Sequence, residues 1–115
     1  KQVKVGAKIG DVSNAVYEYA TKHKLGVVRE LTGHGIGRDM HEAPDVPNYG
    51  NKNTGITLKE GMAIAIEPML NYGKRHVAIL EDGWTIVTRD GSNSAHFEHT
   101  VILTKDGVII TTERL

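Results

Sequence analysis

The sequence of 115 residues contains no cysteine and carries a formal net charge of zero, with 14 Lys and Arg against 14 Asp and Glu. Without cysteine there is no disulfide framework, no thiolate nucleophile and no Cys-ligated metal site, so any metal must be bound by oxygen and imidazole. The absence of a basic excess argues against a nucleic-acid partner. No apolar run approaches the length of a membrane span, and no signal peptide is visible. We therefore expect a cytoplasmic protein without a membrane partner.

Val and Ile number 21 against 7 Leu, and ten Thr add to the β-branched residues, which favours strands. One helix is predicted over residues 12–25, with Asp11 as its N-cap and Gly26 as its stop signal. The Gly- and Pro-rich segment 32–61 is expected to be mostly turns and loop. The predicted strands are 27–31, 62–70, 75–81, 84–89, 95–104 and 108–112. These elements indicate an α+β fold in which one helix packs on a curved, mainly antiparallel sheet.

Glu67 follows a run that is apolar on both faces, which is typical of a buried central strand. An ionised carboxylate is costly in such a place unless it is paired or bound to a metal. Pro68 cannot donate to a strand ladder, so Glu67 is expected at the end of the strand. The alternative to a functional carboxylate is a buried ion pair with Arg or Lys.

Glu98 lies in a predicted strand where alternation places it on the same face as His96, with His99 turned away. His34 lies between Gly33 and Gly35, which allow backbone to approach closely. Glu98 could instead belong to a solvent-exposed polar stripe, and His34 could be an ordinary turn residue. Together, one imidazole and two carboxylates form a ligand set that suits Mn, Fe, Co or Zn, and carboxylates can bridge two ions.

Four stretches of the sequence carry a family resemblance: GHGIGRDMHEAP at 33–44, AIEPM at 65–69, DGWT at 82–85 and SAHFEHT at 94–100. The chain resembles the C-terminal half of type I methionine aminopeptidases, members of the pita-bread family that also includes prolidase and aminopeptidase P. The resemblance spans essentially all of the chain and implies that residues 1–115 form a single half of a pita-bread fold.

The resemblance implies a metallopeptidase that removes the N-terminal methionine of peptides with the help of two divalent ions, chosen from Co, Mn, Fe and Zn. By position, His34, Glu67 and Glu98 correspond to metal ligands, with Glu98 bridging the ions. Glu67 also corresponds to a proton relay. His41 corresponds to a His that contacts the scissile amide, and Trp84 to a wall of the methionine pocket. We expect His96 to support the ligands from outside.

Family members carry two further aspartate ligands and another catalytic His in an N-terminal half, so this chain holds three of the five expected ligands. The sequence also begins at Lys1, not Met, and we expect that its start was removed or that it was cut from something larger. We do not expect ordinary peptidase activity from the isolated chain. Its expected partner is a complementing N-terminal half or a second copy that docks isologously as a homodimer. The alternative function is that of an excised or designed, self-associating metal-binding half-domain.

Overall fold

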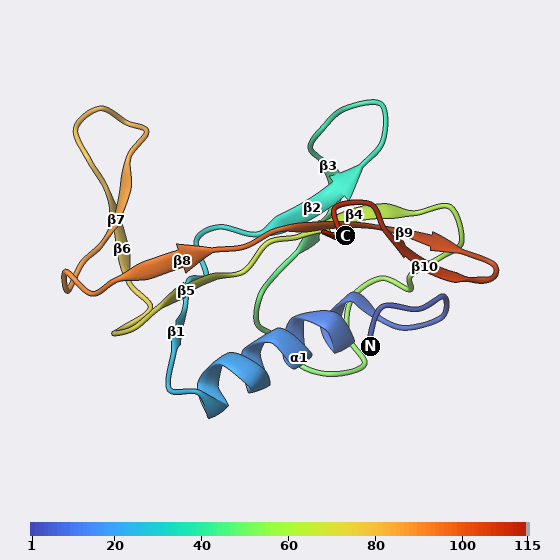
Figure 1. Cartoon of the computed structure of the whole chain (residues 1–115), viewed down its shortest axis with the longest axis horizontal. Coiled ribbons are helices and arrows are strands. Elements are labelled where there is room, and N and C mark those ends of the chain that lie inside the picture. Colours follow the sequence, from blue (N-terminus) through green and yellow to red (C-terminus); the bar gives the residue numbers. More distant parts are fainter. Residues whose placement is uncertain (115) are drawn as a thin grey trace.

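The computed structural model describes residues 1–114 and has one helix, α1 (Ile9–Lys22), lying along one face of antiparallel β-structure (Figure 1). Every strand pair is antiparallel. The α+β prediction of one helix on a mainly antiparallel sheet is therefore confirmed. Within residues 1–114, α1 falls short of the length and apolarity that a membrane-crossing helix requires.

The helix begins and ends three residues earlier than the sequence predicts, and both of its capping residues differ from the expected ones. Asp11 is not the N-cap but the third helical residue, and its carboxylate accepts the N–H of Lys8 at 2.9 Å and that of Asn53 at 2.8 Å. These backbone hydrogen bonds, that from Asn53 foremost, lower the pKa of Asp11. At the other end Lys24, not Gly26, adopts the left-handed conformation with φ of 59°. The Leu25 N–H donates to the Ala20 carbonyl oxygen in the last helical turn.

The larger sheet has five strands in the order β10-β9-β4-β2-β3. Their bounds are Gly107–Ile110 for β10, His99–Thr104 for β9, Ala63–Ile66 for β4, Gly33–Ile36 for β2 and Glu42–Val46 for β3. The prediction that 32–61 is mostly loop is thus wrong for β2 and β3. A Cβ on Gly33 would overlap the Ala65 carbonyl oxygen, and one on Gly35 would overlap that of Ala43. These glycines mark close packing of neighbouring strands, not turns.

Two predicted strands are each split into two. The segment 62–70 forms β4 and then β5 (Met69–Asn71), with the break at Glu67 and Pro68. The segment 95–104 forms β8 (Ser94–His96) and β9, with the break at Phe97 and Glu98. Both breaks lie where the chain passes from the five-stranded sheet into a three-stranded one of order β1-β5-β8, in which β1 is only Gly26–Val27.

Within residues 1–114, an apolar cluster lies between α1 and the five-stranded sheet. Leu58, Ile64 and Val46 are fully buried in it, with Ile9 and Val12 of the helix packed nearby. Ile64 and Ala65 show no solvent exposure, which agrees with the prediction of a buried central strand at β4. The core therefore holds β4 rigidly, and Glu67 follows directly from it.

The hairpin of β6 (Val77–Ile79) and β7 (Ile86–Thr88) stands out from the sheets (Figure 1). Asp90 anchors its base: the carboxylate accepts the Lys74 N–H at 2.7 Å and the Ser92 hydroxyl at 2.7 Å. Hydrogen bonds from the Ser92 side chain, and then from Lys74, lower the pKa of Asp90 to about 2. A Cβ on Gly73 would overlap this carboxylate, so the anchor requires glycine there.

Candidate metal centre

Three strands that are neighbours in the five-stranded sheet bring His34, Glu67 and Glu98 together. His34 lies on β2 opposite Ala65 of β4, Glu67 follows β4, and Glu98 precedes β9. One ligand atom from each of the three side chains lies within 4.8 Å of the others. The three residues that the sequence singled out as candidate ligands therefore form one cluster, although 64 positions separate His34 from Glu98 along the chain.

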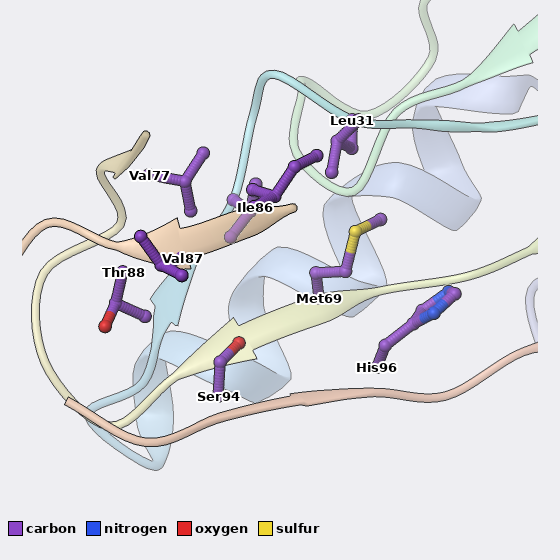
Figure 2. A pocket seen from close by; sticks show the side chains of 9 residues that line it. Leu31, Met69, Val77, Ile86, Val87, Thr88, Ser94 and His96 are labelled. Atoms are coloured by element: carbon purple, nitrogen blue, oxygen red, sulfur yellow. The ribbon is translucent and has the colours of Figure 1, made fainter. Parts of the chain in front are cut away.

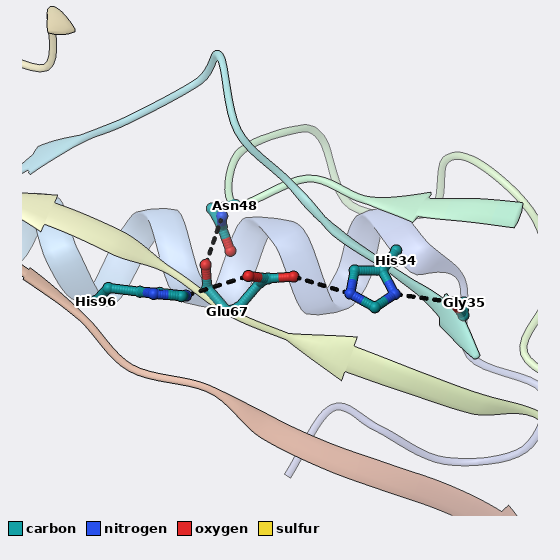
Figure 3. A network of polar contacts seen from close by, with 5 residues as sticks. All are labelled: His34, Gly35, Asn48, Glu67 and His96. Carbon is teal, nitrogen blue, oxygen red and sulfur yellow. Dashed lines mark hydrogen bonds and ion pairs between the residues drawn. The ribbon is translucent and has the colours of Figure 1, made fainter. Parts of the chain in front are cut away.

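The protonation of His34 follows from its neighbours (Figure 3). Its Nδ1 lies 2.9 Å from the Gly35 carbonyl oxygen. A carbonyl oxygen only accepts, so Nδ1 must carry the proton. The other ring nitrogen, Nε2, lies 3.2 Å from Glu67 Oε1. In a neutral imidazole this nitrogen has a bare lone pair, and it faces a carboxylate oxygen that also presents lone pairs.

Two facing lone pairs require a cation between or beside them, either a proton or a metal ion. Two ligand atoms that each lie about 2.1 Å from one ion are separated by about 3.0 to 3.4 Å at the angles of octahedral and tetrahedral sites. The 3.2 Å between His34 Nε2 and Glu67 Oε1 falls in that range. The His side chain is 12% and the Glu side chain 14% exposed, so the pair is shielded but reachable. The donor set therefore fits a divalent ion.

The ion-pair partners of Glu67 are histidines, not the Arg or Lys of an ordinary buried ion pair. While Oε1 faces His34, Oε2 lies 3.1 Å from Nε2 of His96. His96 thus contacts the candidate ligand Glu67, and its support of the ligands stays a prediction. Because the strand breaks at Phe97, alternation does not carry from His96 to Glu98, and His96 contacts Glu67 from the three-stranded sheet.

The local settings of His34 and Glu98 differ from those of an ordinary turn and an ordinary polar stripe. His34 is a strand residue, not a turn residue. Glu98 is exposed, as a solvent-facing stripe requires, yet it lies within reach of both His34 and Glu67.

Sequence patterns missed Asn48, a fully buried residue whose Nδ2 donates to the Glu67 carbonyl oxygen over a long 3.5 Å. It lies in an irregular segment with no periodicity that could have indicated it.

His41 and Trp84 lie at the rim of the same site. The His41 ring lies against that of His34 in a tilted arrangement, with centroids 4.1 Å apart and an interplanar angle of 48°. Both residues line a cavity of about 600 Å³ together with His34 and Glu67. Trp84 is 86% exposed, and Asp82 shapes its turn by accepting the Trp84 N–H at 2.9 Å. Hydrogen bonds from Thr85 and then from Trp84 lower the pKa of Asp82.

A second, apolar cavity of about 310 Å³ adjoins this one under the hairpin. Figure 2 shows Val77, Ile86 and Val87 facing Met69 and His96 across it. Met69 and His96 line both cavities, together with Leu31 and Ile86. The sequence prediction did not include these apolar lining residues, because single Leu, Ile and Met residues at strand ends carry no local signal of a cavity.

The chain is similar to known proteins over nearly all of its length. The family model described as metallopeptidase family M24 matches residues 1–105. The chain is 53% identical over 111 residues to a methionine aminopeptidase of Rickettsia prowazekii, covering 96% of this chain and 43% of that protein. It is 47% identical over 112 residues to methionine aminopeptidase 1 of Bacillus subtilis, covering 97% of this chain and 45% of that protein.

Solved structures show the same similarity. The crystal structure of methionine aminopeptidase from Rickettsia prowazekii matches 96% of this chain and 45% of its own, with a TM-score of 0.93. That of methionine aminopeptidase from Thermotoga maritima is 47% identical and matches 99% of this chain and 46% of its own, with a TM-score of 0.95. The chain thus has the fold of part of these proteins and spans less than half of their length.

Proposed function

The chain belongs to metallopeptidase family M24, and from this premise we propose that residues 1–115 are one half of the catalytic unit of a methionine aminopeptidase. The observation that carries the proposal is the convergence of His34, Glu67 and Glu98 from three adjacent strands. The high identity to methionine aminopeptidases supports it. In this proposal the substrate is the N-terminal methionine of a peptide.

His34, Glu67 and Glu98 would hold the divalent ions, which are two in number and chosen from Co, Mn, Fe and Zn. Such ions supply an activated water and neutralise charge that develops on the carbonyl oxygen. His34 is prepared for this role because its Nδ1–H is held by the Gly35 carbonyl, which leaves Nε2 free to coordinate. His96 orients the Glu67 carboxylate through Oε2.

The remaining roles belong to groups that line the 600 Å³ cavity. Glu67 accepts a proton from the attacking water and passes it toward the leaving amine. His41, whose ring lies against that of His34, donates a hydrogen bond to the scissile amide. The exposed indole of Trp84 forms one wall of the pocket for the methionine side chain.

Only three candidate ligands lie among residues 1–114, so in this proposal full activity requires a partner that supplies the others. We expect a complementing N-terminal half to do so. The test is release of Met from a Met-Ala-Ser peptide with added Co(II), by the chain alone and after mixing with the N-terminal portion of the Rickettsia prowazekii relative. Turnover only in the mixture, and none with Glu67→Gln, is the expected result. If the mixture releases no more Met than the Glu67→Gln mixture, the proposal is wrong.

A second candidate function is that of a homodimeric metal-binding half-domain without normal peptidase activity. Large apolar side chains are exposed around the site: Met40 is 72%, Phe97 60% and Trp84 86% exposed. Exposed apolar patches favour association. In an isologous dimer each copy would contribute His34, Glu67 and Glu98 to one shared site. Sedimentation that shows a strict monomer with and without Mn(II) would exclude this candidate.

A further inference from the structure

The chain after β10 returns to the start of β9 and is bound there by two threonines. Thr111 donates its backbone N–H to the Thr100 carbonyl at 3.0 Å, and its hydroxyl donates to the same oxygen at 3.1 Å. The Thr112 hydroxyl accepts the Thr100 N–H at 3.1 Å and lies 2.8 Å from Nδ1 of His99. Both threonines lie beyond residue 105, where the family match ends.

The two threonines have unequal functions in this contact. In an antiparallel ladder, Thr100 would exchange both of its hydrogen bonds with the residue opposite, which is Thr111. Here the chain turns away, and the Thr112 hydroxyl replaces the missing carbonyl acceptor. The Thr111 hydroxyl only adds a second donor to a carbonyl that is already satisfied. Thr112 is therefore the side chain on which the pairing at this point depends.

This pairing holds one side of the gap that contains Glu98. On the other side, the Phe97 N–H donates to the Pro68 carbonyl oxygen at 3.2 Å. Glu98 lies between these two anchors, outside both β8 and β9, and its side chain is exposed. The core does not pack around the Glu98 side chain, so the position of its carboxylate depends on how firmly the flanking backbone is held.

We propose that Thr112 is a positioning residue for Glu98: by binding His99 and Thr100 it holds the backbone that aims the Glu98 carboxylate at His34 and Glu67. The inference rests on the proposed metal-binding function, because it assigns to Glu98 a position that matters for an ion. It adds a residue from outside the matched family region to the machinery of the site. Thr112 itself touches neither substrate nor metal.

The test compares Thr112→Val with Thr112→Ser and Thr111→Val. Thr112→Val removes the hydroxyl and keeps the β-branched shape, Thr112→Ser keeps the hydroxyl, and Thr111→Val removes only the redundant bond. Mn(II) affinity is measured by calorimetric titration of the full chain. Backbone order at residues 97–99 is measured by ¹⁵N relaxation without metal. If Thr112→Val does not fold, Thr112→Ala, which removes the same hydroxyl without adding a second methyl group, replaces it.

We expect Thr112→Val to bind Mn(II) about tenfold more weakly, the lower end of the loss seen when outer partners of metal sites are removed. Order at residues 97–99 should fall in the same variant. Thr112→Ser and Thr111→Val should stay within about twofold of the unmodified chain in affinity. Unchanged affinity and order in Thr112→Val would overturn the proposal. If the unmodified chain binds no Mn(II), metal binding by the isolated chain fails, and the relaxation measurement alone then decides the role of Thr112.

Discussion

Replacing Glu67 with Gln tests the contact at the centre of the site, because the substitution should affect the metal-free and metal-loaded protein differently. The prediction concerns the neutral His34 imidazole, in which Nδ1 carries the proton. His34 Nε2 and Glu67 Oε1, 3.2 Å apart, then oppose two lone pairs. A Gln amide at this place donates N–H to Nε2 while its oxygen still accepts from His96.

The expected gain without metal is one neutral hydrogen bond, about 1 kcal/mol, partly offset by the weaker bond to His96. For a domain of this size, 1 kcal/mol corresponds to a Tm shift of about 4 °C. Glu67→Gln in EDTA should therefore melt at the same temperature as the unmodified chain or up to about 4 °C higher. This is the reverse of the usual result of removing a shielded charge that has a good partner.

With metal bound, we expect Glu67→Gln to be less stable than the unmodified chain. At a free Mn(II) concentration about 100 times Kd, the unmodified chain gains about 2.7 kcal/mol. Loss of a ligand weakens binding at least about 100-fold, the upper end for the loss of an outer partner, so the variant gains at most about 0.4 kcal/mol. Differential scanning calorimetry in EDTA and in Mn(II) measures the stability of the unmodified chain and of Glu67→Gln without and with metal. The exposed Glu60→Gln is a control that removes equal charge elsewhere. A variant stabilised by Mn(II) as strongly as the control, or destabilised in EDTA by more than about 1 kcal/mol, refutes the reasoning.

Three further predictions concern the framework of the site. The folded pKa of Asp90 is lowered from 3.8 to about 2, so its stabilising contribution is present above pH 3.8 and is lost as the pH falls through about 2. The stability difference between the unmodified chain and Asp90→Asn should therefore shrink across that range in thermal melts, and a constant difference would contradict the assignment. Leu58→Ala, at a fully buried core position, should lower the free energy of unfolding in urea by about 2 to 5 kcal/mol with an unchanged m-value. Gly35→Ala should cost at least about 1 kcal/mol in the same assay, because its Cβ overlaps the Ala43 carbonyl oxygen; no loss would show that β2 and β3 do not pack as described.

The residue types and local order of the sequence were enough to predict several features. A run that is apolar on both faces and ends at Glu67-Pro68 predicts a buried strand with a carboxylate at its exit, and β4 has this form. β-branched residues and one segment with helix start and stop signals predict a helix on antiparallel strands. These are properties of short segments, since alternation, capping and turn preference act within a few residues.

Features that depend on packing between distant segments could not be predicted locally. Considered with their sequence neighbours alone, Gly33 and Gly35 indicate a turn. In the structure both lie in a strand, where the carbonyls of Ala65 and Ala43 approach too closely for a side chain. His96 contacts Glu67, 29 residues away, because the break at Phe97 moves it into another sheet.

By itself, the sequence determined which groups are present: no thiol, balanced charge, and one imidazole with two carboxylates in suitable local settings. Only the tertiary structure decided that these three groups meet, that Gly35 directs the His34 proton away from the cluster, and that Thr112 binds the backbone beside Glu98. The physical reason is that the order and register of strands are set by burial of the common core. That is a property of the whole chain, whereas donor and acceptor types belong to single residues.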